Sequence, residues 1–235
     1  MANPTYAEVE TEIRRLCNDS NLTFPIFSQQ QIFQLIRQAT GFLHNQLRKR
    51  LEGADAQGKV RINTPRADHP YWRQYWKSKT IALIVDTLEY SLPSDEASLS
   101  TADRFDIFHS LVDASTGREL LPYDLANEQT IKRSALLGAH STHGLYAFAP
   151  GDKIRVLVSP GSDGTPKEVR NLLLRFFRSV YIPAVPIDTE QVDMRQEFTR
   201  ALALYASYRL LQSKRVAAPA LMEEFAAEVA GVAAA

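Results

Sequence analysis

Apolar residues recur at helical spacing in the N-terminal part of the chain. Positions three or four residues apart predict a helix that begins at Asn3-Pro4 and a longer one that runs from Ser28 to about Gly53. The longer helix opens with Ser28 and Gln31 in the spacing of a capping box. Each predicted helix has one apolar stripe that must be covered by another element.

A similar apolar stripe appears late in the chain. It predicts a helix that begins after Asp188, which has capping spacing with Gln191, and that ends near Arg215. The helices can cover their stripes only by packing on one another. We therefore expect the helices from both ends of the chain to form one bundle.

The middle of the chain is patterned for strands instead. The stretch "TIALIVDTLEYSLP" is rich in β-branched residues and predicts a strand that breaks near Asp86 and stops at Pro93, which has no N–H to donate. "DRFDIFHSLVD" and "EVRNLLLRFFRSVYIP" predict two further strands, and "GLYAFAPGDKIRVLVSPG" predicts a hairpin that turns at "PGD". A short helix before this hairpin is expected to have Asp124 as its N-cap.

This order of elements predicts an α+β fold. Residues 1–53 and 188–216 are expected to form the helical bundle, and residues 54–187 a β-rich insertion lobe with a short helix. Residues 217–235 are left as an Ala-rich C-terminal tail with a sparse apolar stripe. That stripe consists of Leu221, Met222, Phe225 and Val229. We interpret the tail as a mobile docking segment, because an apolar face without a partner in its own chain usually belongs to another chain.

Composition narrows the class of protein. The chain has 235 residues, of which 45% are hydrophobic, enough for a packed core. Its 27 basic and 27 acidic residues give no net charge, which argues against nucleic-acid binding through bulk charge. The single cysteine, Cys17, cannot form an intrachain disulfide. The N-terminus does not have the pattern of a signal peptide, and no apolar run is long enough for a membrane span. We expect folding in a reducing cytoplasm.

The sequence predicts no catalytic residue, cofactor or metal site. His140 and His143 are three residues apart, but glycines flank them and no Cys, Asp or Glu lies nearby at ligand spacing. Asp95 and Glu96 could form an acid–base pair, but no partner or pocket is indicated beside them, and a solvated loop is the plainer interpretation. The phosphate-binding glycine motifs and the common hydrolase motifs are absent. We therefore do not expect an enzyme.

The aromatic and basic segment "YWRQYWK" has three interpretations. Interleaved aromatic and basic side chains can stack on and clamp single-stranded nucleic acid. They can also form a partner or subunit interface, because Trp, Tyr and Arg dominate binding hot spots. They can finally cover the edge of an ordinary core. The residues of the interface hypothesis are Tyr71, Trp72, Arg73, Tyr75 and Trp76.

The order of these segments resembles the adaptor proteins of tailed bacteriophages, also called head-to-tail connector or head-completion proteins. A helix pair is followed by an apolar strand that ends "Y-x-L-P-x-D", at Tyr90, Leu92, Pro93 and Asp95. "RELLPYDLANEQ" is similar to the family's strand that leads into a short helix, and "GLYAFAPGDKIRVLVSPG" to its hairpin. "LLLRFFRSVYIP" and "ALALYASYRLL" are similar to its last strand and the helix that follows. The resemblance covers most of residues 5–215.

The resemblance implies a structural virion protein at the head–tail junction. It implies a closed homo-oligomeric ring of about twelve copies under the portal vertex of the capsid. Such a ring extends the DNA channel, and double-stranded DNA passes through its lumen without sequence-specific binding. The implied partners are the portal protein on one side and a tail tube, nozzle or stopper protein on the other. We expect synthesis in the cytoplasm of a bacterial host, no membrane partner, and docking of the C-terminal tail on the portal.

Two other functions stay open. A single-stranded nucleic-acid-binding protein would use residues 71–77 and the basic run in "NQLRKRLE", and its binding would weaken as salt rises. A small hydrolase with an unrecognised site would need a pocket that contains carboxylates with perturbed pKa values.

Overall fold

The structure is a computed structural model that describes residues 3–19, 21, 25–54, 60–62, 70–95, 97–133, 144–157 and 170–234. It has an α+β fold, as the sequence predicts. His69, Glu96, His140 and His143 lie outside the described residues, as does the loop "SPGSDGTP".

The chain divides into two compact units. The first, which we call the helical unit, comprises Met1–Arg73, Ala97–Ser100 and Val180–Ala235. The second, the β unit, comprises Gln74–Glu96 and Thr101–Ser179. The β unit therefore begins after the predicted boundary at residue 54 and ends before the predicted boundary at residue 187.

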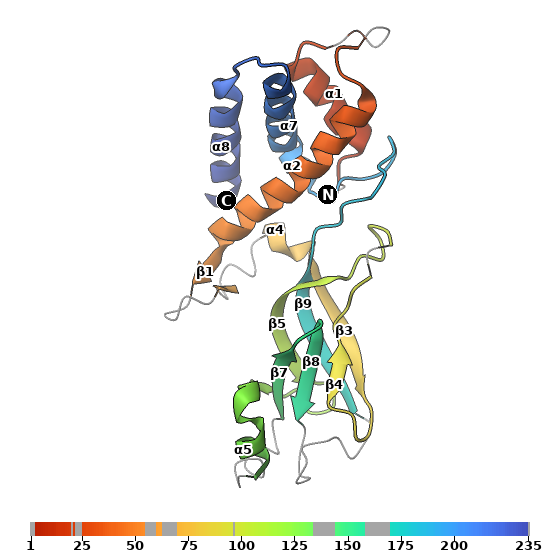
Figure 1. Cartoon of the computed structure of the whole chain (residues 1–235), viewed down its shortest axis with the longest axis vertical. Coiled ribbons are helices and arrows are strands. Elements are labelled where there is room, and N and C mark those ends of the chain that lie inside the picture. The colour runs from red at the N-terminus through yellow and green to blue at the C-terminus, as the bar shows by residue number, and fades with distance from the viewer. Residues whose placement is uncertain are drawn as a thin grey trace. The chain divides into compact units, whose positions relative to one another are not determined.

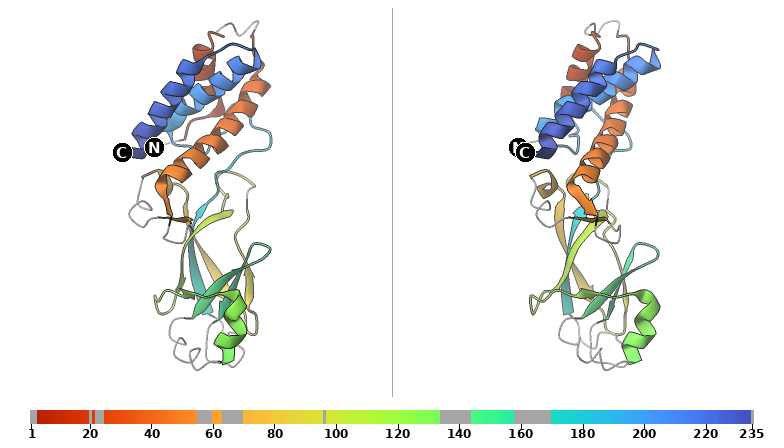
Figure 2. Two further views of the ribbon diagram at one scale, coloured as in Figure 1. Left: turned by 60° about the vertical axis from the view of Figure 1, so that its left-hand side comes forward. Right: turned by 90° about the vertical axis from the view of Figure 1, so that its left-hand side faces the viewer.

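The helical unit is built around one central helix. Its main helices are α1 (Tyr6–Leu16), α2 (Gln29–Leu51), α7 (Thr199–Ser213) and α8 (Pro219–Ala234). α7 contacts the other three, and α2 also contacts α1 and α8 (Figures 1 and 2). Alanines alternate with leucines along the first part of α7, and small side chains allow neighbouring helices to approach it closely. Its buried residues include Ala201, Leu202, Ala203, Leu204, Ala206 and Leu210.

The first helix begins later than predicted. Thr5 is its N-cap, and the Thr5 hydroxyl accepts a hydrogen bond from the Glu8 N–H at 3.2 Å. The Glu8 carboxylate accepts in return from the Thr5 N–H at 2.7 Å. This reciprocal capping box satisfies two donors that a helix start otherwise leaves unpaired, which explains why Asn3 is not the cap.

The late helix also begins after its predicted start. A short 3-10 turn, η2 (Gln196–Phe198), precedes α7. Asp188 is not a cap, because its backbone carbonyl accepts from the Ala7 N–H at 3.2 Å and its carboxylate accepts from the Gln29 amide at 2.9 Å. Capping spacing in the sequence could not reveal these partners, which are far away along the chain.

Two short strands and a helical turn join the helical unit to the β unit along the chain. β1 (Glu52–Ala54) pairs antiparallel with β2 (Val60–Ile62), and α4 covers Pro70–Arg73. All three belong to the helical unit, although the sequence assigned residues from 54 onward to the insertion.

Two sheets form the β unit. One has the strand order β3-β9-β5, from β3 (Trp76–Leu83), β9 (Arg170–Arg178) and β5 (Phe105–Asp113). The other has the order β4-β8-β7-β6, from β4 (Glu89–Ser91), β8 (Lys153–Leu157), β7 (Leu145–Ala149) and β6 (Leu121–Pro122). The strand pairs are antiparallel except β6 with β7. The turn η1 (Leu125–Asn127) and helix α5 (Glu128–Arg133) follow β6, with Asp124 as the predicted cap.

The two sheets form separate layers that share one core (Figure 1). Residues from both sheets belong to a single buried cluster, for example Leu83 of β3, Phe176 of β9 and Ile154 of β8. β8 buries Ile154 and Val156 on one side, which is the alternation typical of a strand.

Candidate functional site

The residues of the strand end "Y-x-L-P" have a structural role in the β unit. Tyr90 and Leu92 alternate with the exposed Ser91 and point into the core of the β unit. The Tyr90 hydroxyl accepts from the Ile84 N–H at 3.1 Å and donates to the Thr87 carbonyl at 2.8 Å. It therefore fixes the turn between β3 and β4, where the chain passes from one sheet to the other and Asp86 has a positive φ of 60°.

The acidic loop after Pro93 is closed by backbone and side-chain contacts. The Asp95 N–H donates to the Asp103 carboxylate at 2.9 Å, and the Asp95 carbonyl accepts from the Asp103 N–H at 2.8 Å. Lys79 forms an ion pair with the same carboxylate at 2.5 Å. Asp95 thus holds the loop closed through its backbone, and Pro93 ends the pairing of β4 because it has no N–H.

The aromatic and basic segment is largely core. Trp72 lies fully buried in the helical unit, where its ring meets His44 edge to face at 5.9 Å. Tyr75 is fully buried in the β unit under the guanidinium of Arg178. Neither ring is accessible in this conformation, and an interface through these two side chains stays a prediction. Base stacking also requires exposed ring faces.

Trp76 and Arg73 of this segment are more accessible. Trp76 is 37% exposed and packs edge-on against His109 and Phe177. Arg73 is exposed. The side chain of Tyr71 lies outside the described part of the structure. Interface or nucleic-acid contacts through Trp76 and Arg73 stay predictions.

The C-terminal tail has a partner within its own chain. It forms α8, which packs on α7 and α2. The Phe225 ring lies 5.8 Å from Phe42 and 5.7 Å from Tyr205, two rings that stack on each other at 4.3 Å. The expectation that the stripe is unpartnered is therefore wrong.

Burial separates the residues of the tail stripe into two pairs. Phe225 and Val229 are buried and cannot serve as a docking surface while α8 is packed. Leu221 and Met222 are half-buried, so portal binding through these two stays a prediction.

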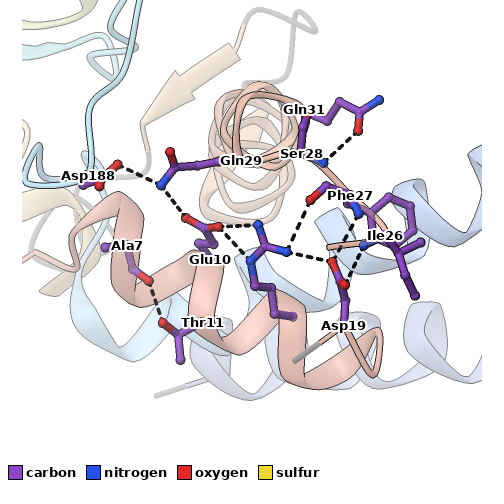
Figure 3. Close-up of polar contacts among 11 residues, drawn as sticks. Ala7, Glu10, Thr11, Asp19, Ile26, Phe27, Ser28, Gln29, Gln31 and Asp188 are labelled. Carbon is purple, nitrogen blue, oxygen red and sulfur yellow. Dashed lines mark hydrogen bonds and ion pairs between the residues drawn. The ribbon is translucent and has the colours of Figure 1, made fainter. Parts of the chain in front are cut away.

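A buried polar cluster ties α1 to the start of α2 (Figure 3). The Arg14 guanidinium donates to Glu10 at 2.8 Å, to Asp19 at 2.7 Å and to the Phe27 carbonyl at 3.3 Å. Asp19 also accepts from the backbone N–H groups of Ile26 and Phe27 at 2.8 and 3.2 Å. Every carboxylate of this cluster has a cationic partner, so it holds the connection between the helices in place.

Gln29 extends this cluster to the segment before α7. Its amide donates to Glu10 at 3.1 Å and to Asp188 at 2.9 Å (Figure 3). No local pattern predicts this arrangement, because Gln29 and Asp188 are far apart along the chain.

A second polar cluster joins α5 to the sheet of the β unit that contains β4 and β8. Glu128 is buried and forms ion pairs with Lys132 and Arg155, both at 2.6 Å. The Tyr123 hydroxyl donates to the same carboxylate at 3.1 Å, and Arg155 also pairs with Glu89 at 2.7 Å. Burial alone would raise the pKa of Glu128, but hydrogen bonds from Lys132 and Arg155 outweigh it and hold that pKa below its usual value.

This lowered pKa predicts a dependence of stability on pH. A carboxylate whose pKa is depressed by folding stabilises the protein above its unfolded pKa, and that contribution is lost as pH falls through the folded value. At neutral pH, Glu128→Gln is expected to lower the free energy of unfolding of the β unit by about 1–3 kcal/mol. The difference from the parent chain should shrink below about pH 4, as measured by hydrogen exchange of the β8 amides. A difference that stays constant across this range would contradict the assignment.

A groove runs along α2 in the helical unit. Its first part has a volume of about 590 Å³ between the first turns of α2 and residues 184–189. A second hollow of about 490 Å³ continues along α2 to Phe42 and Ile182, and both hollows share Gln34 and Arg37. We call the two together the α2 groove. Val185 and Ile187 line its first part and are 81% and 60% exposed.

Comparisons with known proteins do not identify the chain. No family model matches its sequence, and a search of curated proteins returns no match.

Searches for two other kinds of site were negative within the described residues. None of the described histidine, cysteine, aspartate and glutamate side chains gather in a group of three or more that could hold a metal ion. Across the same residues, every helix falls short of the length and apolarity needed to cross a membrane.

Proposed function

We propose that this protein is a structural component of a tailed-phage virion, an adaptor that forms a ring between the capsid portal and the tail and extends the DNA channel. The order of its segments supports the proposal, because it resembles the adaptor family over most of residues 5–215. The portal protein, a tail tube, nozzle or stopper protein, and further copies of the chain are its proposed partners.

The proposal includes a finer architecture. The helices from both ends act as one bundle, and the β unit acts as a lobe inserted between α4 and α7. Contacts of α7 with α1, α2 and α8 support this view, since these helices come from opposite ends of the sequence. The strands of both main sheets all lie between residues 76 and 178, which also supports it.

The observation that carries the proposal is the presence of exposed aliphatic side chains on both units. Ile84 and Val85 of the β unit are exposed, as are Val185 and Ile187 of the helical unit. A subunit of a closed ring needs two different surfaces, one for each neighbour. Two separate units with their own exposed aliphatic residues meet that requirement.

A virus with an early stop codon in this gene tests the proposal. Heads and tails should accumulate separately, and electron microscopy should show few or no joined particles. Expression of the intact chain from a plasmid should restore them. Infectious tailed particles without the protein would overturn the proposal.

A further inference from the structure

The α2 groove contains a cation, Arg37, that forms no ion pair with the described residues. Arg37 lines both of its hollows and stands between two exposed glutamines, Gln34 and Gln38. Its Nε atom is buried without a hydrogen-bond partner, and no described carboxylate forms an ion pair with it. A buried donor without an acceptor is costly, so an occupant with a carboxylate would be favoured here.

The rest of the groove suits an aliphatic occupant. The exposed Val185 and Ile187 line its first part together with the buried Phe33. The acidic member of the lining, Asp188, already accepts from the Gln29 amide. A volume of about 590 Å³ is within the range of roughly 300–1,000 Å³ that small binding sites have. The groove therefore selects for short aliphatic side chains next to one carboxylate.

The β unit presents a segment with these properties. We call residues 84–87, the turn between β3 and β4, the β3–β4 tip. Ile84 and Val85 are 60% and 42% exposed, although turns favour polar residues and glycine. Asp86 follows them and is exposed. A carboxylate has about four acceptor positions, so Asp86 can accept from an arginine in addition to contacts in its own chain.

The tip is held in shape before any partner binds. The Tyr90 hydroxyl bonds to both ends of the turn, at Ile84 and Thr87, and the Thr87 N–H donates to the Ile84 carbonyl at 3.1 Å. Preorganisation of this kind reduces the entropy lost on binding.

We infer that the β3–β4 tip of one copy docks in the α2 groove of a second copy of this chain. Ile84 and Val85 pack against Val185 and Ile187, and Asp86 pairs with Arg37. One chain carries both complementary surfaces, which is the condition for head-to-tail contacts that close into a ring. The inference rests on the proposed ring and names the contact between its neighbouring subunits.

Cross-linking tests this contact even where it is weak. A four-residue tip cannot bury the roughly 1,200 Å² of a stable interface, so a covalent trap is needed. In a Cys17→Ala background, full-length Val85→Cys chains are mixed with Val185→Cys chains and oxidised in a glutathione buffer. Disulfide heterodimers should exceed the two homodimers by roughly tenfold, because docking raises the effective thiol concentration. With Val216→Cys, an exposed site elsewhere in the helical unit, in place of Val185→Cys, the mixture should give only the statistical ratio.

Charge reversal provides the decisive control. Arg37→Glu in the groove chain, or Asp86→Arg in the tip chain, should lower the heterodimer yield about tenfold, and the two together should restore it. Arg209→Glu, on the exposed side of α7, should have no effect. Circular dichroism of each variant confirms that it is folded.

Two outcomes overturn the inference, and both are distinct from a failure of the proposed function. A statistical ratio of dimers, or a yield that does not respond to Arg37→Glu, would show that a second copy does not dock in this groove. If rings still form on portals in that case, the adaptor function stands and the groove takes a portal or tail segment instead. If no ring forms at all, the adaptor proposal fails as well.

Discussion

Replacing Phe225 with alanine is expected to destabilise the helical unit by about 3–5 kcal/mol. The Phe225 side chain is buried against Phe42 and Tyr205, so its removal leaves a cavity between α8, α2 and α7. Chemical denaturation followed by circular dichroism measures the change. Deletion of residues 217–235 should cost at least as much, because it also exposes the contacts of Val229.

Met222→Ala is the matched control for this prediction. Met222 lies on the same helix but is only half-buried, so its truncation should cost clearly less than that of Phe225. Equal and small effects of the two substitutions would show that α8 is not part of the stable core. The tail would then again be a candidate for a mobile docking segment.

Arg14→Ala is expected to destabilise the helical unit by a similar amount, about 3–5 kcal/mol. It removes the described cation that pairs with both Glu10 and Asp19, and two buried carboxylates then lose this partner. The neighbouring Arg15 pairs with Glu12 on an exposed face, so Arg15→Ala should cost less than about 1 kcal/mol. Denaturation midpoints of the two variants compare these costs, and equal midpoints would contradict the structural role of the Arg14 cluster.

Local pattern predicted most of the secondary structure. The break near Asp86, the cap at Asp124 and the "PGD" hairpin all occur as expected, because each depends on a few consecutive residues. The late start of α7 was missed because the partners of Asp188 are Ala7 and Gln29. Contacts over such a separation leave no trace in local periodicity.

The candidate surfaces were harder to predict than the fold. An aromatic and basic run looks the same in sequence whether its rings are buried, as for Trp72 and Tyr75, or accessible, as in part for Trp76. The stripe of α8 looked too sparse for an intrachain contact, but Phe42 and Tyr205 already form a stacked pair that Phe225 completes. Whether the Nε atom of Arg37 finds a hydrogen-bond partner among the described residues depends on what surrounds it in space, which no motif encodes.

The central claim is that copies of this chain assemble on a portal. The most direct test is the mass of portal rings from the same virus before and after purified protein is added. The account predicts a discrete gain that corresponds to about twelve chains of 26.4 kDa each, whether or not the free protein is a monomer. A portal ring whose mass does not change in the presence of excess folded protein would contradict it.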